Sequence, residues 1–366
     1  MTNRKNMYSL LTVVLVTAAV LVLAMPASAT FPGKNGRIAF QQGSPSSASS
    51  DIYTMNPDGS DVQQLTFFVA SGGSAQAPFW SPDGSQLVFV GAASAANGPF
   101  QLWIMNFDGS NQHLLLNDPA YGDWVPSFSP DGRHIVFSRC GPINCAIYRI
   151  NADGSGLKAL TPFNSDPDIV DWEPVYSPDG STIAFTSLWR NGLFEAIYLM
   201  KADGSGMHSF TPPRLGAIGG NWSPDGESIV FLSNDPFDCG VECFPLSSEL
   251  WTISAGDGHT TRLTFNNQHW DGINSVPHDL WPSWSPQGDA IVFERDAPDF
   301  SSSALYIMNP DGSNLRQVLQ LPTSRVIPAP ARRIFAGPKR TRPDITLIEQ
   351  GGSYPRWGAA QQGRAH

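Results

Sequence analysis

The stretch Asp123–Phe137 reads DWVPSFSPDGRHIVF, and the turn at its centre returns along the chain. The motif Ser-Pro-x-Gly is found at Ser81–Gly84, Ser129–Gly132, Ser177–Gly180, Ser223–Gly226 and Ser285–Gly288. Proline presets the first corner of such a turn, aspartate can hydrogen-bond its own backbone, and glycine takes the positive φ that closes a hairpin. The repeat therefore predicts a series of tight turns between antiparallel strands.

The segments on either side of each turn also recur. Before the turn, an aromatic residue follows a proline by two positions, as Phe128 follows Pro126; in one copy Gly220 replaces the proline before Trp222. After the turn comes an apolar run such as Ile135–Phe137, with no alternation of polar residues. A strand that is apolar on both sides must be covered on both faces. We therefore expect small sheets that pack against one another.

Each repeat continues with a third strand, such as Ile147–Ile150, and a second hairpin turn that ends in Asp-Gly and begins with asparagine in four of the six copies. A brief fourth strand follows and often closes on Leu-Thr. The glycines that close the second turn are Gly59, Gly109, Gly154, Gly204, Gly258 and Gly312, which gives a period of 45 to 54 residues. Four short antiparallel strands at this period predict one blade of a β-propeller.

The two ends of the chain carry complementary parts of one repeat. The first repeat begins at Arg37–Phe40 and lacks its aromatic strand, whereas Tyr354–Gly358 repeats the Pro-x-aromatic pattern. We therefore predict an all-β, six-bladed β-propeller of four-stranded antiparallel blades, closed by a C-terminal strand (353–358) that completes the first blade. This single domain spans 30–366 and includes a basic, Pro-rich connector at 321–350. A β-sandwich or an open array would leave the complementary ends unexplained.

Residues 1–29 are predicted to be a signal peptide. Arg4 and Lys5 precede the apolar run Leu10–Leu23, and the small residues Ala27–Ala29 follow. The run is short for a membrane span, so we expect cleavage after Ala29, export to the periplasm or outside the cell, and no stable membrane insertion afterwards. An uncleaved membrane anchor is the alternative.

The four cysteines form two local pairs, Cys140 with Cys145 and Cys239 with Cys243. In an exported protein, an even number of cysteines at short spacing predicts disulfides. A four-cysteine zinc site is the alternative, but its usual spacing is C-x2-C, and the pairs here are C-x4-C and C-x3-C. No metal or cofactor is expected.

The formal net charge of −10 argues against nucleic acid as a partner, because the phosphate backbone attracts basic proteins. The basic stretch Pro322–Arg342 could bind an acidic partner, although a solvated connector has the same composition. We expect a monomer.

The turns and strands together resemble the TolB-type propeller repeat of bacterial envelope proteins. The resemblance rests on the aromatic-Ser-Pro-Asp-Gly turn, the Ile-x-Phe strand, the Ile-Tyr-x-Met strand and the Asn-x-Asp-Gly turn, and it covers about Arg37 to Trp357. TolB itself carries an α/β domain before its propeller, for which Thr30–Gly36 leaves no room. Similar repeats serve in peptidase propellers and in sugar-acting lyases, so the resemblance implies the fold more firmly than the function.

The loops predicted to link the blades contain acidic residues beside tryptophans. The candidate binding residues in these loops and at their edges are Asp123, Trp124, Asp171, Trp172, Glu173, His269, Trp270, Asp271, His278 and Trp281. Aromatic rings with nearby carboxylates suit a sugar ring or a cationic side chain of a partner. Alternatively, each tryptophan packs under its loop as part of the core.

Three other interpretations involve the same region or the turns. The segment Asn164–Glu173 could bind calcium, but it lacks the spacing and the glycine of a calcium loop. His269 and His278 could ligate a metal or act as acid–base groups, with no third histidine nearby. The aspartates that recur in the first turn, such as Asp131, recur because the turn needs them.

These observations favour an exported, non-catalytic scaffold that presents a loop-rich face to a protein or glycan partner in the cell envelope. The alternative is a polysaccharide-acting enzyme, a lyase or hydrolase, with its site at the loop-rich mouth of the channel. A calcium-stabilised structural module is a third possibility.

Overall fold

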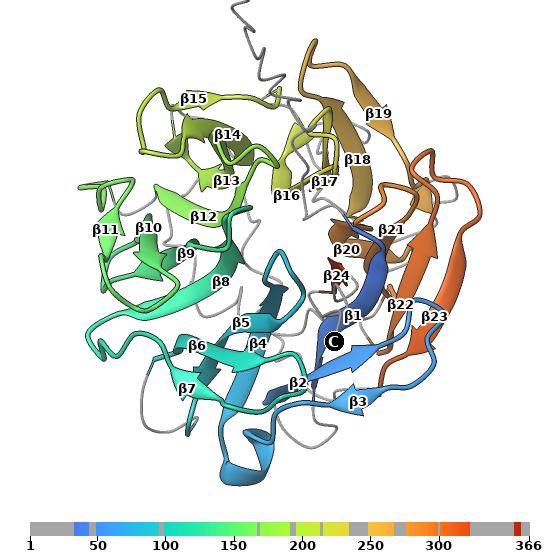
Figure 1. Cartoon of the computed structure of the whole chain (residues 1–366). Helices are drawn as coiled ribbons and strands as arrows, with labels where there is room; N and C mark the ends of the chain where they lie inside the picture. Colours follow the sequence, from blue (N-terminus) through green and yellow to red (C-terminus); the bar gives the residue numbers. More distant parts are fainter. Residues whose placement is uncertain are drawn as a thin grey trace, which may run out of the picture.

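The computed structural model describes residues 33–43, 49–94, 99–166, 169–190, 195–212, 215–233, 248–266, 276–298, 301–322 and 355–359. They form six four-stranded antiparallel sheets that follow one another around a ring (Figure 1). This arrangement confirms the six-bladed propeller. Among these residues, no helix is long and apolar enough to cross a membrane.

The first three blades are given with their strands from the inside of the ring outwards. Blade 1 contains β24 (Arg356–Ala359), β1 (Asn35–Gly43), β2 (Ser50–Met55) and β3 (Gln63–Gln64). Blade 2 contains β4 (Ser74–Trp80), β5 (Gln86–Ala92), β6 (Gln101–Asn106) and β7 (His113–Leu114). Blade 3 contains β8 (Gly122–Phe128), β9 (His134–Cys140), β10 (Cys145–Asn151) and β11 (Lys158–Ala159).

The other three blades keep the same order. Blade 4 contains β12 (Val170–Tyr176), β13 (Thr182–Leu188), β14 (Glu195–Lys201) and β15 (His208–Ser209). Blade 5 contains β16 (Ala217–Trp222), β17 (Ser228–Ser233), β18 (Glu249–Ser254) and β19 (Thr260–Arg262). Blade 6 contains β20 (His278–Trp284), β21 (Ile291–Asp296), β22 (Ser303–Met308) and β23 (Arg316–Gln320).

The Ser-Pro-Asp-Gly turn is held by its own side chains. In blade 3, the Ser129 hydroxyl donates a 2.6 Å hydrogen bond to the carboxylate of Asp131, and the N–H of His134 donates to the Ser129 hydroxyl at 2.9 Å. Gly132 has a φ of 69° and donates its N–H to the Ser129 carbonyl. The recurring aspartates are therefore structural, as the sequence predicted.

The threonine of the Leu-Thr ending fixes the outer part of the blade. The Oγ1 of Thr161 accepts a 2.9 Å hydrogen bond from the N–H of Ile147 on the third strand. Thr66, Thr211 and Thr264 make the same bond in blades 1, 4 and 5. Each threonine satisfies a buried N–H at the point where the chain leaves for the next blade.

The C-terminal strand closes the ring, as expected. β24 pairs antiparallel with β1, so that Trp357 lies opposite Ile38, and the two strands are neighbours in Figure 1. The Trp357 indole N–H donates to the carbonyl of Gly36 at 3.1 Å. Residues 1–32 and 323–354, which hold the predicted leader, most of the connector and the start of the closing segment, lie outside the described residues.

The second strands are buried on both faces, which explains their unbroken apolar runs. Ile135, Val136 and Phe137 are all fully buried. Val136 packs with residues of blade 4, whereas its two neighbours pack on the opposite side, in the cluster that extends into blade 2. Burying one such side chain contributes roughly 1.5–3 kcal/mol relative to leaving it exposed.

A β-bulge interrupts the innermost strand of blades 2 to 6. The register shifts at this bulge, and one residue takes a positive φ directly before the proline or, in blade 5, before Gly220. These bulge residues are Ala77, Val125, Glu173, Gly219 and Trp281. The bulge lets pairing continue beyond a residue that cannot donate a hydrogen bond.

Three of these bulges are held by the preceding blade. The N–H groups of Ala77, Glu173 and Gly219 donate 3.0 Å hydrogen bonds to side chains on the second strand of that blade. The acceptors are Gln41, Ser138 and Thr186. These contacts tie neighbouring blades together near the axis and place the bulge side chains there.

Candidate binding site at the axis of the ring

The predicted site residues that the structure describes lie in innermost strands and not in the blade-linking loops where we expected them. Asp123 and Trp124 belong to β8, Asp171–Glu173 to β12, and His278 and Trp281 to β20. The bulge is the reason, because it lets each strand begin several residues before its proline. His269, Trp270 and Asp271 lie outside the described residues.

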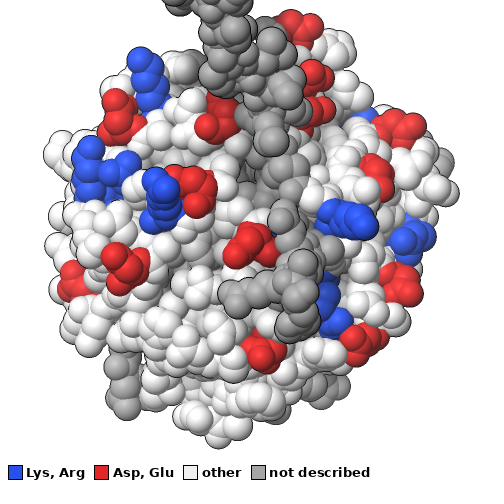
Figure 2. Space-filling view, viewed as in Figure 1, with Lys and Arg blue, Asp and Glu red and all other residues white. Residues whose placement is uncertain are grey.

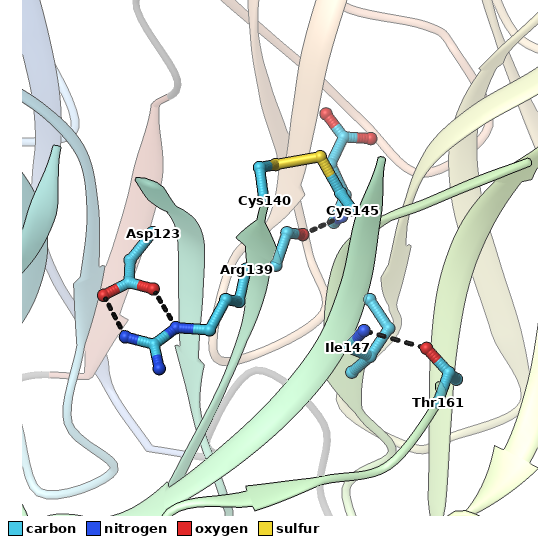
Figure 3. The surroundings of a disulfide bond; sticks show 8 residues. Asp123, Arg139, Cys140, Cys145, Ile147 and Thr161 are labelled. Carbon is cyan, nitrogen blue, oxygen red and sulfur yellow. Dashed lines mark hydrogen bonds and ion pairs between the residues drawn. A yellow bond between two sulfur atoms is a disulfide. The ribbon is translucent and has the colours of Figure 1, made fainter. Parts of the chain in front are cut away.

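Asp123 and Asp171 are engaged in internal ion pairs. Arg139 donates from Nε to Asp123 at 2.8 Å (Figure 3), and Arg190 contacts both oxygens of Asp171 at 2.8 and 2.7 Å. In blade 6, the Asp279 carboxylate makes an equivalent pair with Arg295. These carboxylates are buried and paired with arginines within their own blades.

Aromatic rings cover all three arginines, and the centre of the Tyr198 ring lies 5.9 Å from the Arg190 guanidinium. The Arg139 guanidinium lies 5.0 Å from the centre of the Tyr121 ring and 5.6 Å from that of Tyr148. Arg295 has Tyr306 at 5.0 Å. Such stacking adds a cation–π attraction to the ion pair and supports a structural role.

One of the two predicted disulfides is confirmed. Cys140 and Cys145 are bonded and lie directly opposite each other at the ends of β9 and β10 (Figure 3). The bridge closes the short loop beside the Asp123–Arg139 pair. Cys239 and Cys243 lie outside the described residues.

Trp124 and Trp172 belong to the core, which supports the packing alternative for both. They are 8% and 5% exposed, and their ring centres are 6.0 Å apart. Trp124 also contacts Phe100 at 4.6 Å between ring centres.

Glu173 and Trp281 do converge, and the bulge glycine between them is the reason. A Cβ built on Gly219 would lie 3.3 Å from Oε2 of Glu173 and 3.9 Å from Cε3 of Trp281. The three residues come from blades 4, 5 and 6. The charge of Arg356 on β24, in blade 1, also acts on the Glu173 carboxyl. Residues from four consecutive blades can approach one another only near the axis of the ring.

The Glu173 carboxyl is buried and incompletely hydrogen-bonded. Its side chain is 5% exposed, and Oε2 accepts a 3.3 Å hydrogen bond from the Thr186 hydroxyl. Oε1 has no partner among the described residues. Burial raises the pKa of Glu173 to about 7, and the charge of Arg356 lowers it only in part. This group can therefore accept a hydrogen bond or exchange a proton near neutral pH.

The histidine and calcium alternatives gain no support from the described residues. Burial lowers the pKa of His278 to about 4, so its imidazole is neutral at pH 7. Asp171 is paired with Arg190, and Glu173 lies at the axis. In the described ranges, no three His, Cys, Asp or Glu side chains are placed to hold one metal ion.

Sequence reasoning missed Gly219 and Arg356 as parts of this site. The signal for Gly219 was visible, because Gly219-Gly220 is where a repeat loses its proline. Arg356 is the residue between the proline and the tryptophan of the closing segment. Only the closed ring brings it near Glu173.

Charge is mixed on the surface seen in Figure 2. Acidic and basic side chains of the described residues are interspersed there with uncharged ones. A nucleic-acid surface would require a gathered basic patch.

The fold and its repeated turns define a class of protein, the six-bladed TolB-like propellers. The family described as TolB beta propeller domain matches residues 121–329, which is more than half of the chain. The chain therefore belongs to the TolB beta propeller domain family.

Solved structures share this fold at low sequence identity. TolB from Acinetobacter baumannii is 20% identical with a TM-score of 0.64, covering 89% of this chain and 67% of that protein. A putative TolB from Agrobacterium tumefaciens is 19% identical with a TM-score of 0.58, and the match covers 90% of this chain and 100% of that one. Hydrazine synthase of Kuenenia stuttgartiensis is 16% identical with a TM-score of 0.61, covering 92% of this chain and 49% of that one. Likeness at these identities concerns the fold alone.

A curated relative matches one part of the chain more closely. An uncharacterized protein of Agrobacterium fabrum is 38% identical over 87 residues. The aligned part covers 24% of this chain and 27% of that protein.

Proposed function

We propose that this chain is an exported TolB-like propeller that acts as a non-catalytic scaffold for a protein or glycan partner in the cell envelope. Membership in the TolB family, the leader-like N-terminal sequence and the disulfide support export. The binding role is supported by what the two faces of the ring expose.

The two faces differ by topology. In each antiparallel blade, the turns between strands one and two and between strands three and four lie at one end, which we call the turn face. The connections between strands two and three and those between blades lie at the other end, which we call the loop face. The longer and more variable connections all belong to the loop face.

The observation that carries the proposal is the set of apolar side chains exposed on the loop face. These are Phe67, Ile143, Trp189 and Phe265, with exposures of 61%, 56%, 42% and 53%. Phe67 and Phe265 share one position, directly after the threonine that ends their blades, whereas Ile143 and Trp189 lie in the connections between the second and third strands of blades 3 and 4. On the turn face Phe107 is also exposed, and the exposed Val62, Leu157 and Leu315 occupy one position of the repeat. Large apolar side chains that differ from blade to blade fit a specific partner better than a structural repeat does.

A capture experiment with matched variants tests the proposal. The mature protein, a Phe67→Ala/Ile143→Ala/Phe265→Ala variant and a Phe107→Ala/Leu157→Ala/Leu315→Ala variant of the turn face would each be immobilised. Each would be exposed to an envelope extract and to a glycan array. We expect the loop-face variant to lose the specific ligand and the turn-face variant to keep it. Equal retention by both variants would rule out the loop face.

The alternative, an enzyme acting on polysaccharide, is favoured by one observation: a buried carboxyl with a pKa of about 7 at the axis, near Arg356. If it were correct, purified protein would release reducing ends or unsaturated products from a polysaccharide, and Glu173→Gln would abolish the release. Turnover that survives this substitution would exclude Glu173 as the catalytic group.

A further inference from the structure

One connection of the loop face exposes an apolar side chain although the connection itself is firmly held. Residues 141–144 join β9 to β10 in blade 3, and the disulfide between Cys140 and Cys145 closes them at their base (Figure 3). The side chain of Ile143, in the middle of this connection, is 56% exposed. An isoleucine that only had to be packed away would not be presented to solvent on a loop closed by a covalent bond.

Hydrogen bonds also tie this loop to the link that follows blade 3. Asn144 is 1% exposed, and its Nδ2 donates to the carbonyls of Asn164 and Asp166 at 2.7 and 3.2 Å. Within the loop, the N–H of Gly141 donates to the carbonyl of Asn144 at 3.0 Å. Each restraint reduces the conformational entropy that the loop would lose when a partner covers it. A rigidly held, exposed isoleucine is therefore suited to anchor a partner.

Two aromatic rings flank the loop and extend its apolar surface. A Cβ built on Gly141 would lie 3.4 Å from Cε1 of Tyr121 and 3.6 Å from Cε1 of Phe163. The two rings are stacked with their centres 5.8 Å apart, and both residues are partly exposed. Tyr121 comes from the link before blade 3 and Phe163 from the link after it, so the three connections meet at one place. We call Tyr121, Ile143 and Phe163 the blade-3 patch.

The charge around the blade-3 patch is negative. Asp118 and Asp166 are the charged residues of its three segments, 117–121, 140–145 and 160–166. Asp166 is exposed, and the side chain of Asp118 is 34% exposed. The Arg139 guanidinium beneath them is buried and lies 3.3 Å from Asp118 and 2.8 Å from Asp123. One positive charge therefore faces two carboxylates, and the excess negative charge lies towards solvent.

We propose that the blade-3 patch binds a basic, partly apolar peptide segment of a protein partner. Apolar side chains of the segment pack on Ile143 and Phe163, and a lysine or arginine lies beside Asp118 or Asp166. An acidic segment would be repelled by these carboxylates, and the Ile143 side chain offers a glycan no hydrogen-bonding group. This inference rests on the proposed function and adds the chemistry of the partner and the blade that binds it.

An array of synthetic decapeptides tests this assignment on the full mature, oxidised protein. Three matched sets would combine leucine, isoleucine and phenylalanine with lysine and arginine, with aspartate and glutamate, or with serine and glutamine. We expect binding to members of the basic set alone. For the tightest of these, titrated by calorimetry, Ile143→Ser should weaken the affinity at least about tenfold. The matched change Leu157→Ser, at a 41% exposed position of the turn face, should leave the affinity unchanged.

A second pair of variants tests the charge. Asp118→Asn/Asp166→Asn should weaken the affinity at least about threefold and reduce its dependence on salt, because exposed charges act through a screened attraction. The change Glu227→Gln, at an exposed position of the turn face, should do neither. Thermal unfolding would verify that each variant is folded, and Ile143→Ser remains decisive if the acidic variant unfolds.

The proposal is overturned by preferential binding of the acidic or the neutral set, by the absence of binding, or by equal affinities of the Ile143→Ser and Leu157→Ser variants. Full affinity in a folded Asp118→Asn/Asp166→Asn variant would also overturn it. If these tests failed while the loop-face variant still lost its ligand in the capture experiment, the proposed function would stand without the blade-3 patch. Failure of both experiments would remove the proposed function as well.

Discussion

Buried carboxyl groups in this ring are compensated to different degrees. Asp171 and Asp279 each share both oxygens with a guanidinium group. Asp123 also has its arginine, yet burial still raises its pKa to about 6. For Glu173, burial outweighs the charge of Arg356 and the hydrogen bonds from Thr186, Gly219 and Trp172, and its pKa reaches about 7. Desolvation therefore outweighs the available partners most clearly at the axis.

The raised pKa of Glu173 predicts how stability depends on pH. The folded state holds this proton more tightly than the unfolded chain does, because the ordinary pKa of the group is 4.5. Its contribution to the free energy of unfolding is therefore fully present below about pH 4.5 and is lost as pH rises through about 7, by at most about 3 kcal/mol.

The substitution Glu173→Gln should remove the loss of stability that the ionisation of Glu173 causes between about pH 4.5 and about pH 7. Denaturant unfolding at about pH 5 and about pH 8 would give the change in unfolding free energy for the wild type and for the variant. Asp123 and His278 titrate in both proteins, so the difference between the two changes reports Glu173 alone. If the two proteins changed in parallel between these pH values, Glu173 would not hold a raised pKa.

Among the elements, the innermost strands have the most to do with function, because their bulges place side chains at the axis. Three bulges are held by a polar side chain from the preceding blade. In blades 2 and 5, the residues that correspond to these acceptors, Val90 and Leu232, are apolar. Hydrogen bonds from the preceding blade therefore hold only some of the bulges, and the bulges at Glu173 and Gly219 are among those held.

Ser138→Ala should destabilise the protein by about 1–3 kcal/mol, because it leaves the buried N–H of Glu173 without its acceptor. The same substitution at the exposed Ser209 of β15 should change stability by less than about 0.5 kcal/mol. Chemical denaturation gives both values, and hydrogen exchange should show faster exchange at the Glu173 amide. An unchanged exchange rate would show that this bond does not hold the bulge.

The disulfide between Cys140 and Cys145 joins the two strands of one hairpin. Cys140→Ala/Cys145→Ala opens a loop of about six residues, and the chain-entropy model predicts a loss of roughly 2 kcal/mol. Comparing oxidised wild type with the double variant by thermal unfolding isolates this bridge. A loss well above that value would mean that the bridge also holds the Asp123–Arg139 pair in place.

For the whole molecule, the decisive feature is the seam where the two chain ends share a sheet. β24 pairs with β1, and Trp357 is 4% exposed in the core of the seam. The side chain of Asn35 also donates to Asp289 in the turn of blade 6 at 3.0 Å. A ring is cooperative, because opening one seam exposes the faces of the blades on both sides.

Deleting residues 355–366 should therefore lower the stability of the entire ring by at least about 3 kcal/mol, in a single transition. Deleting only 360–366 keeps β24 and should have little effect. Differential scanning calorimetry of the two truncated proteins and the intact chain makes the comparison. If the shorter chain melted like the intact one, the seam would not close the ring.

The sequence alone was enough to predict the six blades, their two turns, the buried second strands and the closing strand. These features depend on local chemistry that repeats: proline and glycine in turns, a threonine at the end of four of the blades, and apolar runs with a fixed period. It also predicted the pairing of Cys140 with Cys145, because the spacing is short.

The site was decided by tertiary structure. Trp172 and Glu173 are adjacent in the sequence, yet the folded strand places the first in the core and the second at the axis. Asp123 and Asp171 became structural because the folded sheets bring arginines beside them. Arg356 and Gly219 are far apart in the sequence and approach the same carboxyl only when the ring is closed. Local patterns repeat in every blade, but the axis is formed by contributions from different blades at once, and no single repeat contains that information.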